Sequence, residues 1–179
     1  MNPQIRKGIG QVKRRMKECI VETIYEVTER GLAGWRKPDT DRIKINTDAA
    51  INRGAGMVGL GWVARDSTGA FLAGAAIPRK GVCLPKEAEA LSMREALSWI
   101  KAAGWDQVDV ESDALHLVEG VHSASTESSF GLLVNDIKEL ATSFSSITFS
   151  HVKRSANRVA HHMARAAVSM SDSCLWQHF

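Results

Sequence analysis

Three acidic residues stand at positions where a divalent cation could be bound. Glu89 lies one helical turn before Met93, so it belongs to the apolar side of a predicted helix rather than to its solvent side. Asp48 and Asp113 each end a predicted strand. Carboxylates at neighbouring strand ends, with one on a covering helix, could converge, and a divalent cation is the usual counter-charge for such a group. The pattern therefore predicts a metal site.

Each of these residues also has an ordinary structural explanation. Asp113 could be the N-cap of a helix that starts at Ala114, and Asp48 could be a turn residue. Glu89 could pair with Lys86 on its own helix. The order of strand-end Asp, helix Glu and strand-end Asp is more specific than any single member, so we keep the metal site beside these alternatives.

Hydrophobic periodicity indicates the elements that must position these side chains. Alternating or aliphatic runs typical of strands occur at 43–48, 57–64, 71–77, 107–111 and 147–152. Helical spacing occurs at 86–103, 114–122, 130–144 and 156–170. The first three strands are joined by tight turns, which predicts an antiparallel meander. The order βββαβααβα predicts an α/β fold, a mixed five-stranded sheet with helices on both faces.

Charge divides the chain into an arm and a domain. The 179 residues are 44% hydrophobic and carry a formal charge of +3. Residues 1–35 hold seven Lys and Arg and four Glu, so this segment carries the whole excess. Its apolar residues recur at steps of three or four, which predicts an amphipathic helix. We expect an arm and linker at 1–38, the domain at 39–170 and a tail at 171–179.

The arm has three possible roles. It could pack on the domain or on a protein partner, it could bind nucleic acid, or it could be an organellar targeting segment, because residues 1–17 are basic and free of acid. No apolar run is long enough to cross a membrane. The three scattered cysteines have no metal-binding spacing and indicate an intracellular, reducing compartment, nuclear or cytoplasmic.

Five short segments follow one another along the domain, at 43–48, 59–66, 88–90, 110–113 and 151–160. Together they resemble type 1 ribonuclease H domains, and most closely the plant reverse-transcriptase-like group related to retrotransposons. The likeness covers about residues 42–168 and implies the ribonuclease H fold. It also implies metal-dependent cleavage of the RNA strand of an RNA–DNA hybrid by four carboxylates and two Mg²⁺ ions.

The resemblance assigns the metal ligands residue by residue. The first three carboxylates fall on Asp48, Glu89 and Asp113, and the fourth position, four residues after Asn157, is His161 instead of Asp. If His161 is a ligand, the resemblance implies two ions with a preference for Mn²⁺ over Mg²⁺, because imidazole suits softer metals. Alternatively, His161 packs on its helix without binding a metal.

Basic residues near the last motif are the candidate substrate contacts. Lys153, Arg154 and Arg158, together with Asn157, lie where the phosphates of a hybrid would pass, although such a run could also be a solvated helix face. Recognition would depend on shape and not on base sequence. We therefore expect a sequence-independent endonuclease for hybrids. The alternatives are a nucleic-acid-binding module with weakened or lost chemistry, and a protein-interaction domain assembled through the N-terminal helix.

Overall fold

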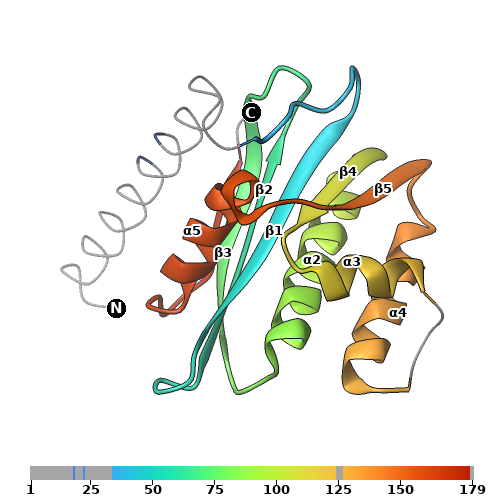
Figure 1. Ribbon diagram of the computed structural model, residues 1–179. Helices are drawn as coiled ribbons and strands as arrows, with labels where there is room; N and C mark the ends of the chain where they lie inside the picture. The colour runs from blue at the N-terminus through green and yellow to red at the C-terminus, as the bar shows by residue number, and fades with distance from the viewer. Residues whose placement is uncertain (1–17, 19–21, 23–33, 124–126, 178–179) are drawn as a thin grey trace.

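The computed structural model describes residues 18, 22, 34–123 and 127–177, and Figure 1 shows their fold. The helix expected within residues 1–35 lies largely outside these residues. The strands are β1 (Ile43–Asn52), β2 (Met57–Arg65), β3 (Phe71–Lys80), β4 (Gln107–Ser112), β5 (Ser146–His151) and β6 (Cys174–Gln177). The helices are α2 (Pro85–Ala102), α3 (Leu115–His122), α4 (Ser129–Ala141), the 3-10 turn η1 (Arg154–Ala156) and α5 (Arg158–Ala167). None of the described helices has the length and apolarity needed to cross a membrane.

One mixed sheet orders the described strands as β5-β4-β1-β2-β3-β6. β1, β2 and β3 form the expected antiparallel meander, while β4 runs parallel to β1 and β5 runs parallel to β4. The predicted α/β fold is confirmed, but the predicted number of strands is too small by one. The additional strand, β6, comes from the expected tail and pairs antiparallel with β3.

β6 forms because its four residues alternate between buried and exposed positions. Cys174 and Trp176 are buried, whereas Leu175 is exposed. Trp176 packs in a small core on the α5 side of the sheet, together with Val63 of β2 and Met163 of α5. A strand this short carries too little periodicity to be predicted from sequence.

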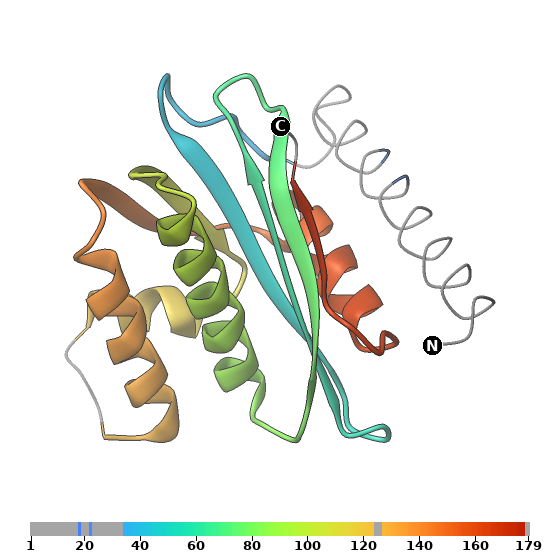
Figure 2. The ribbon, with the colours of Figure 1, turned by 180° about the vertical axis from the view of Figure 1, so that it is seen from behind.

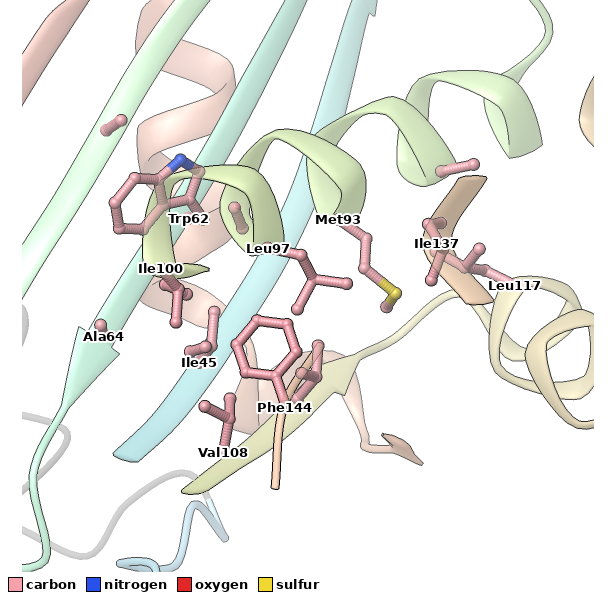
Figure 3. Packing of buried hydrophobic residues seen from close by; sticks show 14 of the residues in the cluster. Ile45, Trp62, Ala64, Met93, Leu97, Ile100, Val108, Leu117, Ile137 and Phe144 are labelled. Carbon is pink, nitrogen blue, oxygen red and sulfur yellow. The ribbon is translucent and has the colours of Figure 1, made fainter. Parts of the chain in front are cut away.

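Helices cover both faces of the sheet. Figures 1 and 2 show α2, α3 and α4 on one face and α5 on the other. The larger core lies on the α2 side, where Trp62, Met93 and Leu97 are buried (Figure 3). Trp62 belongs to this core and packs against the partly buried Trp99. This packing holds α2, and with it Glu89, against the strands.

α5 lies very close to the sheet because β2 has glycines beneath it. A Cβ atom added to Gly61 would lie only 2.3 Å from the backbone nitrogen of Ala164, and Gly59 is equally crowded. On the helix side, Ala160 and Ala164 are completely buried. Gly61 is also the β2 partner of Asp48. The close approach therefore brings the first turns of α5 beside Asp48.

Candidate active site

Asp48 and Asp113 are brought together because β1 and β4 are parallel and in register. The last paired residues are Thr47 and Ser112, and each aspartate follows one of them. β1 continues to Asn52, so Asp48 lies inside its strand and not at the predicted strand end. β4 stops at Ser112, so beyond that point the described part of β1 is paired only with β2. The two aspartates therefore lie just past the point where the pairing of β1 with β4 ends.

Glu89 reaches the two aspartates from the second turn of α2. Its carboxyl group is hydrogen-bonded with that of Asp48 and lies close enough to Asp113 for the charge of Asp113 to raise its pKa. Burial, followed by the charge of Asp48, raises the pKa of Glu89 from 4.5 to about 10. Burial also raises the pKa of Asp48, against hydrogen bonds that lower it. The three carboxyl groups share one site, in which Glu89 keeps a proton at neutral pH.

The alternative explanations for these residues are wrong. Ala114 is the N-cap of α3, and Asp113 instead accepts a hydrogen bond from Asn157. The ammonium group of Lys86 lies over the ring of Phe130, 5.1 Å from its centroid, so it does not neutralise the carboxyl group on α2. Neither helix capping nor an ion pair with Lys86 therefore accounts for Asp113 and Glu89.

The last helix and its N-cap add two side chains to the site. The amide of Asn157 donates to Oδ1 of Asp113 at 2.6 Å and to the backbone carbonyl of Thr47 at 2.9 Å. Nδ1 of His161 lies 2.6 Å from Oδ2 of Asp48. The start of α5 is thus bonded to β1 and to the residue that follows β4. His161, at the fourth position of the motif, contacts Asp48, at the first.

Among the predicted substrate contacts, Arg154 touches the site besides Asn157. Its Nη2 lies 3.1 Å from Nε2 of His161. Lys153 and Arg158 are exposed next to it, and within the described chain their side chains make no hydrogen bond or ion pair. These two cations are therefore available to an external anion.

The donor set suits a hard divalent cation. Oε2 of Glu89 is buried without a hydrogen-bond partner. The raised pKa values of Glu89 and Asp48 indicate a site short of positive charge. Carboxylate oxygens are the ligands that Mg²⁺ and Mn²⁺ prefer. In the described residues no three ligand side chains already surround a common metal position; Asn157 and His161 instead occupy aspartate oxygens.

A buried polar network, which was not predicted, joins β1 and β4 just before the aspartates. Nδ2 of Asn46 donates to Oε2 of Glu111 at 2.9 Å, and Nζ of Lys44 lies 2.7 Å from the other oxygen of that carboxylate. Arg65 of β2 donates to Asn46 at 2.7 Å, and burial lowers the pKa of this arginine to about 9. The network supports the register of β1 and β4 that places Asp48 beside Asp113.

Trp35 covers this network and attaches the expected linker to the domain. Its ring centroid lies 3.6 Å from the guanidinium carbon of Arg65, and its Nε1–H donates to Asn46 at 3.0 Å. Trp35, like Phe71 and Met170, also packs against the small core on the α5 side. Contacts of the domain therefore extend back to Trp35, into the segment expected to be a linker.

The metal-free protein should lose stability as the pH rises through neutrality. Because the pKa of Glu89 is about 10 in the folded chain and 4.5 in its ordinary state, the folded state keeps a proton that the unfolded state releases between these values. The free energy of unfolding should then fall by at most about 1.4 kcal/mol per pH unit. Urea unfolding at pH 6 and 8 in EDTA measures this slope. Glu89→Gln should flatten it, whereas Glu139→Gln, at an exposed position of α4, should leave it unchanged.

The sheet order and the placement of the carboxyl groups define an α/β domain of the ribonuclease H fold. A similar solved structure is RNase H1 from the halophilic archaeon Halobacterium salinarum, with 22% identity, a TM-score of 0.66, and coverage of 72% of this chain and 98% of that one. LC11-RNase H1 in complex with an RNA/DNA hybrid gives 22% identity, a TM-score of 0.64, and coverage of 71% and 96%.

The family follows from the sequence comparison. The sequence pattern of the reverse transcriptase-like family matches residues 46–167, more than half of the chain, and the chain belongs to this family. A protein of Arabidopsis thaliana named "Putative ribonuclease H protein" is 29% identical over 171 residues, which cover 93% of this chain. The chain spans 27% of the length of that relative. The resemblance drawn from the motifs is confirmed.

Proposed function

We propose that the domain hydrolyses the RNA strand of RNA–DNA hybrids, without base specificity and with divalent metal ions. The observation that carries the proposal is the convergence of Asp48, Glu89 and Asp113, with the pKa of Glu89 raised to about 10. A carboxyl group that is kept protonated by burial and by the charges of neighbouring carboxyl groups is suited to bind a cation. The RNA/DNA hybrid bound by LC11-RNase H1, which shares this fold, supports the choice of substrate.

The three carboxylates would hold the metal, joined by His161 in the two-ion arrangement that the family implies. A bound divalent ion would activate water and stabilise the leaving oxygen, so no protein nucleophile is required. The chain's own groups keep the ligands in place. The backbone N–H of Ala49 donates to Oδ1 of Asp48 at 2.8 Å, and Asn157 holds Asp113. Asp48 is 3% exposed, so bulk water has little access to it.

The direct test is cleavage of an end-labelled hybrid by the full chain in Mg²⁺, in Mn²⁺ and in EDTA. We expect cuts only in the RNA strand, only with metal, and none in duplex RNA or duplex DNA of the same sequence. Binding of the hybrid without cleavage in either metal would support the non-catalytic module instead. A chain that binds neither hybrid nor duplex RNA but self-associates through residues 1–35 would support the interaction domain.

Removing the cations of Lys153, just before η1, and Arg158, the first residue of α5, should weaken hybrid binding in a salt-dependent way. Lys153→Ala with Arg158→Ala should lower the slope of log K against log salt by about 0.7–0.9 for each phosphate that these side chains neutralise. Lys80→Ala with Lys101→Ala is the matched control, because it removes the same charge from exposed positions on other elements. Equal slopes for the two double variants would assign Lys153 and Arg158 to a solvated surface.

The basic arm is proposed as a second contact for nucleic acid. Its predicted helix lies largely outside the described residues, and the proposal rests on its charge. Deleting residues 1–33, which spares Trp35 and its contacts with the domain, should weaken hybrid binding and flatten its salt dependence. Fluorescence anisotropy across a salt series measures both. Unchanged affinity for the hybrid would support the alternative that the arm packs on the domain or on a protein partner.

A further inference from the structure

The segment that carries α5 is basic and free of acid. Residues 36–179 as a whole are neutral, yet residues 151–171 contain no Asp or Glu. The cationic side chains of this segment are Lys153, Arg154, Arg158 and Arg165. The next acid along the chain is Asp172, between α5 and β6, where it accepts a hydrogen bond from Ser171. The excess of positive charge is therefore local to α5 and to the residues just before it.

The cations of α5 lie on its outward side. The buried side of the helix is made of apolar residues, namely Val159, Ala160, Met163, Ala164 and Ala167. Arg158, His162 and Arg165 are exposed. Steps of four and three residues bring side chains to the same side of a helix. These three residues therefore form one continuous polar surface, which we call the α5 face.

Arg158 and Arg165 are not neutralised within the fold. Arg79 of β3, by comparison, pairs with Glu95 of α2 at 2.7 Å. Among the residues that the structure describes, none forms a hydrogen bond or an ion pair with the side chain of Arg158 or of Arg165. Both guanidinium groups are therefore available to an anion from outside the chain.

α5 leads away from the carboxyl groups of the candidate active site. Gly61 is the β2 partner of Asp48, and a Cβ atom on it would lie 2.5 Å from the backbone oxygen of Ala160. A Cβ atom on Gly59, nearer to the start of β2, would lie 2.9 Å from Cβ of Ala167. The helix thus begins beside Asp48 and runs along the sheet toward the turn between β1 and β2 (Figure 1). The α5 face therefore continues the surface of the site in one direction.

The two arginines are far enough apart to contact different phosphates of one strand. Arg165 follows Arg158 by seven residues, which is about 10 Å along a helix axis. One strand of a duplex has a phosphate about every 3.4 Å of its axis. The α5 face therefore spans about three base pairs when strand and helix run side by side. A phosphate backbone needs cations at the surface and no apolar pocket, so it suits this face.

We propose that the α5 face binds the phosphates of one strand of the hybrid where that strand leaves the candidate active site, with Arg165 as its outermost contact. This inference rests on the proposed function, which supplies the hybrid. It adds the direction in which the duplex is bound, along α5 toward the turn between β1 and β2. It also adds a contact about three base pairs beyond that of Arg158.

The test is binding of hybrids of increasing length by the full chain in EDTA, which removes divalent metal. Fluorescence anisotropy gives the ratio of the dissociation constants of Arg165→Ala and wild type on hybrids of about 6, 9, 12 and 18 base pairs. A longer hybrid offers more registers to both proteins equally, so the ratio reports the contact alone. We expect a ratio near one on the shortest hybrid and of about threefold or more on the longest. Arg158→Ala should reach its full effect on hybrids about three base pairs shorter.

Salt and two control variants separate a phosphate contact from other effects. Raising the salt from 50 to 200 mM should weaken binding of the longest hybrid about threefold more for the wild type than for Arg165→Ala. Arg165→Lys, which keeps the charge, should stay within about twofold of the wild type. Lys101→Ala removes a charge from an exposed position in the last turn of α2, on the other face of the sheet, and should change neither readout.

Wild-type affinity and salt dependence in Arg165→Ala on the longest hybrid would overturn the proposal and make the α5 face a solvated surface. An equal loss on hybrids of every length would also overturn it, because the contact would then not lie beyond the site. Neither readout uses cleavage. The expected length dependence without cleavage in Mg²⁺ or Mn²⁺ would therefore defeat the proposed function alone, and cleavage with unaffected binding by Arg165→Ala would defeat this inference alone. A wild type that binds no hybrid would defeat both.

Discussion

Replacing Asp48 by Asn should reduce cleavage of the hybrid by about a thousandfold or more, equivalent to a loss of about 4 kcal/mol of transition-state stabilisation. Asp48 is the one carboxylate that contacts Glu89, His161 and the backbone of Ala49 together. An amide keeps its shape but cannot carry the charge that binds a cation. Initial rates in saturating Mg²⁺ and Mn²⁺ measure the effect.

Stability separates this loss of chemistry from a loss of fold. Asn at position 48 removes one of the charges that raise the pKa of Glu89, so the metal-free variant should unfold at the same temperature as the wild type or higher. Asp109→Asn is the matched control. Asp109 lies on β4 in an ion pair with Arg42, outside the site, and its substitution should change the rate by less than about threefold. An Asp48→Asn variant that cuts at the wild-type rate would remove these carboxylates from the mechanism.

The site could be predicted because its residue types conflict with their surroundings. A glutamate on an apolar helix side is costly unless it is used, and this conflict is visible in sequence, as is the position of the two aspartates at the ends of predicted strands. Periodicity likewise predicted the meander and the helix that carries Glu89. Sequence could place Asp48 next to Asp113 only as an expectation, because their contact depends on the register of β1 and β4.

The features that were not predicted depend on neighbours distant in sequence. Nothing local marks Trp35 as the cover of Arg65, since the contact exists only once β2 has paired with β1. The motif spacing placed His161 at the fourth position, but not its hydrogen bond to Asp48 or its contact with Arg154. Residue type indicates which chemistry is available, whereas partners decide which chemistry is used.

The largest effect on the fold is expected at Gly61, a β2 residue that pairs with Asp48 and faces α5. A Cβ atom there would lie 2.3 Å from the backbone nitrogen of Ala164 and 2.5 Å from the backbone oxygen of Ala160. Backbone atoms cannot rotate away as a side chain can, so Gly61→Ala must displace α5 from β2. The free energy of unfolding should fall by about 3 kcal/mol, at the upper end of overpacking effects.

Activity should fall together with stability in Gly61→Ala. Asn157, the N-cap of α5, contacts Asp113 at 2.6 Å, and His161 on α5 contacts Asp48 at the same distance, so a displaced helix would lose both contacts. Urea unfolding and hybrid cleavage by the fraction that stays folded measure the two losses. Gly54→Ala is the matched control, since its Cβ would meet its nearest neighbour at an ordinary 3.6 Å, and both properties should stay near wild type. Wild-type stability in Gly61→Ala would contradict the close approach of α5. The glycine on β2 and the polar residues of α5 therefore serve one requirement, a helix near enough to the sheet for its side chains to reach Asp48.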